Sequence, residues 1–217
     1  MLVLAGLMAS LSLSHAWKDL LSRIDALPSI KRRAVNSVIG AAVGDAACRP
    51  LHWLYDRVTR ESILQGTDPV FWPVSLSPFY SLPTGRRSCY NDVALAMLRS
   101  LPPDSNISFD FDSYLDEIMD MFKPSSEYAV AFAKRKEAYD PARKLEERRP
   151  IEGPWQHQAV TVLVGHLAKG EDISGNPSLA ETDGFCSCIP LIARSARGYF
   201  QIEMTFVGCL PTRGETI

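Results

Sequence analysis

Apolar residues recur at helical spacing along most of this chain, and proline or glycine ends each periodic segment. The helices that this spacing predicts begin at or near Ser29, Asn91 or Asp92, Asp112, Gln156 and Phe185. Before Tyr199 no segment shows the alternation of a half-buried strand, whereas residues 199–207 do. The pattern therefore predicts an all-α fold.

Two long loops separate these helices. Residues 66–90 are rich in proline and aromatic residues, and residues 170–184 are rich in small and polar ones. A loop as long as the first is uncommon inside a compact domain and is often functional. Its aromatic residues predict that it packs onto the helices. Residues 127–148 are strongly charged and predict a solvated face.

The composition is that of an ordinary globular protein. The chain has 217 residues, of which 46% are hydrophobic and 22% charged, with a formal net charge of −2. A mostly disordered chain would be poorer in apolar residues and more highly charged. A chain so close to neutrality has no overall field that attracts a polyanion, so we expect no nucleic-acid partner.

The first residues of the chain are apolar and uncharged. Residues 1–14 are too short to span a bilayer, so we expect no stable membrane span. Residues 1–16 have a small residue on each side of His15, as at the cleavage site of a signal peptide, but no basic residues precede them. They are therefore either a signal peptide, which implies secretion, or an alternative start. The five cysteines are an odd and irregular set, which favours the cytoplasm.

Three carboxylates lie at predicted helix ends. Asp45 follows a run of small residues, so it is either open to a ligand or a cap for the next segment. Asp92 either favours the dipole of its helix or presents an oxygen to a hard cation such as Mg²⁺. Asp183 and Gly184 precede a helix whose N-terminus can hold an anion. These residues alone do not name a function.

Several segments together resemble the ADP-ribosylglycohydrolase family. The resemblance lies in residues 38–47 (VIGAAVGDAA), 88–98 (SCYNDVALAML) and 183–191 (DGFCSCIPL). Residues 50–53 (PLHW), 78–85 (PFYSLPTG) and 153–157 (GPWQH) are similar to the branch that contains the J1 crystallins and selenoprotein J.

The resemblance implies an orthogonal all-α bundle with two Mg²⁺ ions at its centre. Active members hydrolyse glycosidic links of ADP-ribose, so the implied partner is ADP-ribose or an ADP-ribosylated protein. The residue roles that it implies are catalytic for Asp45 and His52, metal-binding for Asp92 and Asn91, and substrate-binding for Asp183 and Gly184.

The chain also departs from the family pattern. The family's metal motif has two adjacent aspartates flanked by threonines, but Asn91 replaces one aspartate, and Tyr90 and Val93 replace the threonines. His52 stands where active relatives have a glutamate. Because Mg²⁺ prefers charged oxygen ligands, we expect at most one partial Mg²⁺ site.

The family pattern stops near Arg197, before the family's second metal cluster. We therefore expect an apolar leader or alternative N-terminus over residues 1–28, a partial ADP-ribosylglycohydrolase-like helical domain over 29–197 that is incomplete at its C-terminal end, and a divergent tail over 198–217. Two hypotheses follow. The chain is either an ADP-ribosyl hydrolase or a catalytically inactive, crystallin-like relative with a structural or nucleotide-binding role.

Overall fold

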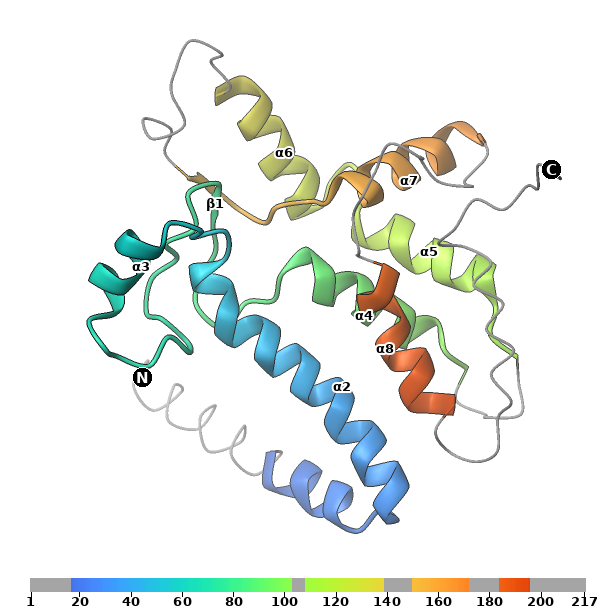
Figure 1. The fold of residues 1–217 in the computed structure, drawn as a ribbon. Coiled ribbons are helices and arrows are strands. Elements are labelled where there is room, and N and C mark those ends of the chain that lie inside the picture. Colours follow the sequence, from blue (N-terminus) through green and yellow to red (C-terminus); the bar gives the residue numbers. More distant parts are fainter. Residues whose placement is uncertain (1–16, 103–107, 139–149, 172–183, 196–217) are drawn as a thin grey trace, which may run out of the picture.

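Helices make up most of the structure, a computed structural model that describes residues 17–102, 108–138, 150–171 and 184–195 (Figure 1). Residues 17–25 form a first helix. The elements after it are α2 (Ser29–Cys48), the 3-10 helix η1 (Arg49–Leu51), α3 (Arg57–Leu64), β1 (Tyr80–Ser81), α4 (Cys89–Ser100), α5 (Phe111–Met121), α6 (Glu127–Ala138), β2 (Ile151–Glu152), α7 (Gln158–Lys169) and α8 (Gly184–Ser195). The expected all-α class is confirmed. The strand pattern at 199–207 lies outside the described residues.

Helix α4 is the centre of the core. It packs against α5, α8 and α2, and Figure 1 shows it (green) between α2 and α5. Four of its buried side chains belong to the hydrophobic core, Cys89, Val93, Ala96 and Met97, and they are spaced so that they share one face of a helix. They contact buried side chains of α5, α6 and α7 and of the segment that follows α5, namely Tyr114, Ile118, Phe122, Tyr128 and Val160.

The N-terminus of α4 differs from the prediction. The helix begins at Cys89, and Ser88 occupies the N-cap position, rather than Asn91 or Asp92. The physical reason is a distant contact, because Asp45 at the end of α2 accepts hydrogen bonds from Ser88 and holds the first turn of α4. Local sequence rules cannot foresee a partner 43 positions away.

Helix α6 agrees with expectation in part. The charged segment predicts a solvated face, and most residues of α6 are exposed, while Tyr128 and Ala131 are buried. The small residues of α2 predicted close approach of another backbone or a ligand. At Gly40 and Gly44, however, no described atom outside the local helix lies within 4 Å of where a Cβ would stand. The structure therefore shows no close backbone neighbour among the described residues at these two positions, and approach of a ligand stays a prediction.

The loop before α4 is packed down, as its aromatic residues predicted. The Phe71 amide donates to the Ala47 carbonyl (2.9 Å), and the Leu76 amide donates to the Pro50 carbonyl (2.7 Å). Within the loop, β1 pairs in parallel with β2, with Tyr80 opposite Ile151. Two paired residues are too few to show alternation, so the sequence pattern missed this pair.

Among the described residues, none of the helices combines the length and the apolar character that crossing a bilayer requires.

Candidate functional site

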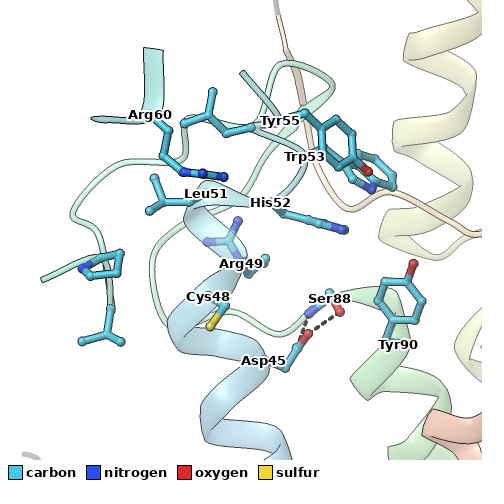
Figure 2. A pocket seen from close by; sticks show the side chains of 13 residues that line it. Asp45, Cys48, Arg49, Leu51, His52, Trp53, Tyr55, Arg60, Ser88 and Tyr90 are labelled. Atoms are coloured by element: carbon cyan, nitrogen blue, oxygen red, sulfur yellow. Dashed lines mark hydrogen bonds between the residues drawn. The ribbon is translucent and has the colours of Figure 1, made fainter. Parts of the chain in front are cut away.

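A pocket of about 440 Å³ lies where α2 ends and the chain turns through η1 (Figure 2). Its walls come from α2, η1, α3, the loop before α4 and the first turn of α4. The residues that line it are Asp45, Cys48, Arg49, Leu51, His52, Trp53, Leu54, Tyr55, Arg60, Pro69, Val70, Ser88 and Tyr90. The structure thus brings together two of the residues predicted from sequence, Asp45 and His52.

Asp45 is tied to α4. Its carboxylate accepts a hydrogen bond from the Ser88 amide (2.7 Å) and another from the Ser88 hydroxyl (2.5 Å), as the dashed lines in Figure 2 show. Each of its two oxygens has one of these donors. Asp45 thus contacts the N-terminus of α4, 43 positions away, rather than the segment that directly follows it, and it also lines the pocket.

His52 lies on the inner wall of the pocket. Its Nδ1 is 2.9 Å from the hydroxyl of the buried Tyr80, and its ring packs on Trp53 with the centroids 4.3 Å apart. Burial, the neighbouring His157 and the Arg49 charge together lower the pKa of His52 to about 4. The imidazole is therefore neutral at physiological pH.

An aromatic cluster surrounds His52 and joins three segments of the chain. Trp53 makes edge contacts with Phe79, Tyr80 and Trp155, at centroid distances of 5.1 to 5.8 Å. The backbone of Trp53 has φ +64°, a left-handed conformation that a bulky residue adopts only when its surroundings enforce it. Such strain is typical of residues held in place at binding sites, and it shapes the pocket wall here.

Arg49 organises the loop beneath the pocket. Its side chain is buried, with 2% of the residue exposed, and donates to the carbonyls of Arg86 (2.8 Å), Leu82 (3.0 Å) and Pro83 (2.8 Å). Sequence reasoning missed this residue. The available signal was an arginine between two predicted apolar segments, a place where an unpaired charge would be costly.

Asp92 lies in a different pocket. That second pocket, of about 310 Å³, is lined by Asp92 together with residues of α4, α6 and the end of α5. The Asp92 carboxylate accepts from Arg87 Nε (2.9 Å) and from the buried Tyr128 hydroxyl (2.7 Å). Burial raises the pKa of Tyr128, so its hydroxyl keeps its proton and donates.

The other residues predicted from sequence are Asn91, Asp183 and Gly184. Asn91 is half-buried in the first turn of α4 and is not among the residues that line either pocket. Gly184 is the first residue of α8, and Asp183 lies outside the described residues. The structure does not gather the six predicted residues into one described site.

The described residues do not fit a dinuclear Mg²⁺ centre. Asp45 is held by Ser88, while Asp92 already faces the Arg87 guanidinium, whose charge would repel a metal ion. In the part of the chain that the structure describes, no three His, Cys, Asp or Glu side chains come together as ligands. Mg²⁺ needs several oxygen ligands around it.

Two curated proteins are similar to this chain. Crystallin J1A of Tripedalia cystophora is 28% identical over 167 residues, which cover 76% of this chain and 47% of that protein. Crystallin J1B of the same animal is 27% identical over 168 residues, which cover 77% of this chain and 48% of that protein. The chain thus spans about half the length of these relatives. No family model and no solved structure matches it. Over about three quarters of its length, the chain is therefore similar in sequence to the J1 crystallins.

Proposed function

We propose that this chain is a non-catalytic relative of the ADP-ribosylglycohydrolases that binds ADP-ribose, free or attached to a protein, in the pocket at the end of α2. The observation that carries the proposal is the state of the two carboxylates. Asp45 and Asp92 serve as structural acceptors in separate pockets, which supports ligand binding over metal-dependent hydrolysis. The homology to the J1 crystallins supports the family assignment and the orthogonal-bundle fold as parts of the same proposal.

The chemistry of the pocket suits a nucleotide of this kind. Its volume lies within the range of about 300–1,000 Å³ that is usual for small-molecule sites. Trp53, Tyr55 and Tyr90 supply aromatic surface for a base, and Arg60 supplies a charge for phosphates. Arg60 makes no ion pair within 4 Å among the described residues, although its charge helps to lower the pKa of the nearby Asp56. A phosphate would compete with that carboxylate for the guanidinium.

Replacing Arg60 with alanine is expected to weaken ADP-ribose binding about tenfold, because a hydrogen bond to a charged group is lost. Isothermal titration measures the effect. Arg57→Ala is the matched control, since Arg57 is on the same helix but pairs with Glu61 and does not line the pocket. Equal affinities for the two variants would contradict the placement of the phosphates.

Hydrolysis is the second candidate function, and one observation favours it. Asp45 and His52, the two residues with an implied catalytic role, line the same pocket. An active chain would release ADP-ribose from an ADP-ribosylated protein and would need Mg²⁺ to do so, so the metal distinguishes the two candidates.

We expect Mg²⁺ neither to stabilise this chain nor to support release of ADP-ribose. If a Mg²⁺ site exists, Mg²⁺ at ten times its dissociation constant would add about 1.4 kcal/mol to the free energy of unfolding, which a thermal melt detects. The melt and the release assay are run with Mg²⁺ and with a chelator. Stabilisation by Mg²⁺ that Asn91→Ala abolishes would instead identify the partial site expected from sequence. Release that depends on Mg²⁺ would establish the hydrolase.

A further inference from the structure

Arg49, Tyr80 and His52 form a row of polar side chains beside the pocket, in which Arg49 and Tyr80 are buried and His52 is half-buried. Tyr80 is 1% exposed. Among the described residues, the acceptor that its hydroxyl can reach is His52 Nδ1, at 2.9 Å. The Arg49 guanidinium also lies close enough to the Tyr80 hydroxyl to act on it electrostatically. The three side chains come from η1, from the residue just after η1 and from β1, so the tertiary structure assembles the row.

The direction of the Tyr80–His52 hydrogen bond follows from the donors and acceptors in this row. A guanidinium carries only donors and a positive charge, so it favours the lone pairs of the Tyr80 oxygen on its own side. The hydroxyl hydrogen then points to His52. A buried hydroxyl needs an acceptor for its hydrogen, and Nδ1 provides one. Burial raises the pKa of Tyr80 to about 12, so this hydrogen is retained at neutral pH.

The same bond determines where His52 carries its proton. A neutral imidazole has one N–H and one lone pair. Because Nδ1 accepts from Tyr80, the N–H must be on Nε2. This nitrogen makes no hydrogen bond to the described residues, and it is not one of their buried polar atoms that lack a partner. His52 also lines the pocket. The packing of the ring on the strained Trp53 restricts its rotation.

We propose that His52 presents a fixed Nε2–H donor to the ligand in this pocket and selects ligands that carry a hydrogen-bond acceptor at that point, such as a ribose or phosphate oxygen or a ring nitrogen. Tyr80 and Arg49 act as positioning residues behind it. A general base at this site would need a lone pair facing the ligand, and the lone pair of His52 faces Tyr80 instead. The identity of the ligand rests on the proposed function, whereas the tautomer does not.

The test reads the tautomer directly. Long-range ¹H–¹⁵N NMR of the ligand-free protein at neutral pH is expected to show His52 with an unprotonated Nδ1 and a protonated Nε2. In Tyr80→Phe, a population with the proton on Nδ1 is expected to appear, because the donor that excludes it is gone. Tyr90→Phe is the matched control, since the Tyr90 ring also packs near His52, whereas the hydroxyl 2.9 Å from Nδ1 belongs to Tyr80. In this variant the single tautomer should persist. A wild-type proton on Nδ1 would overturn the proposal, whether or not the variants fold.

A binding measurement separates this inference from the proposed function. His52→Phe keeps an aromatic ring but has no donor, and it is expected to weaken ADP-ribose binding about tenfold. If the wild type binds ADP-ribose and His52→Phe binds it equally well, the donor role of His52 is wrong while the proposed function stands. If the wild type does not bind ADP-ribose at all, the proposed function fails, and the NMR result alone decides the tautomer.

Discussion

Replacing Gly153 with alanine is expected to lower the free energy of unfolding by about 3–4 kcal/mol, from backbone strain and overpacking together. Gly153 has φ +111°, a conformation that residues with a side chain rarely adopt. A Cβ at this position would stand 2.7 Å from the Cβ of Ala131, which is buried in α6 and has no flexible end that could move aside. The substitution therefore pushes the segment that carries β2 and Trp155 away from α6.

Gly40→Ala is the matched control for this prediction. Gly40 lies within α2, and among the described residues no atom outside the local helix is within 4 Å of where its Cβ would stand. Alanine favours the helix there, so the expected change is a gain of about 0.5–1 kcal/mol. Urea denaturation of both variants measures the two free energies. A Gly153→Ala variant as stable as the wild type would contradict the close approach at Gly153.

Replacing Arg49 with lysine is expected to cost about 2–4 kcal/mol, although the charge is kept. The guanidinium reaches the carbonyls of residues 82, 83 and 86 at once. The lysine ammonium is a compact group that cannot donate to all three carbonyls at once, so buried carbonyls lose their hydrogen-bond donors. Because these carbonyls belong to the loop that follows β1, the loop and the Tyr80–His52 contact should loosen together.

Arg57→Lys provides the comparison for Arg49→Lys. Arg57 is exposed and pairs with Glu61 one turn away, so its replacement should change stability by less than about 0.5 kcal/mol. Chemical denaturation gives both values, and hydrogen exchange of residues 75–88 reports the loop. A small loss at Arg49 with unchanged exchange in the loop would show that its hydrogen bonds do not hold the loop.

Much of the helical architecture could be predicted from local patterns. The prediction that α7 ends before Gly170 is confirmed, because a glycine in the left-handed conformation closes a helix wherever it lies in a fold. The start of α5 near Asp112 was predicted within one residue, since Asp110 caps it through a local side-chain contact. The start of α4 was missed by two or three residues, because its cap depends on Asp45 of another helix.

The candidate site was predictable only in part. Asp45 and His52 stood out as a carboxylate beside small residues and as the histidine at the family's glutamate position, and both line the first pocket. The separation of Asp92 from them could not be seen in the sequence. It depends on Arg87 and Tyr128, which hold the carboxylate in the second pocket.

The sequence by itself determined the all-α class, the approximate extent of most helices and the packing of the proline-rich loop, because apolar spacing and the backbone limits of proline and glycine act over a few residues. Only the tertiary structure decided which polar groups meet. Asp45 contacts Ser88, Arg49 contacts the carbonyls of the loop, and His52 accepts from Tyr80. These pairs are 28 to 43 positions apart, so the packing of whole elements, rather than local propensity, sets the chemistry of the pocket.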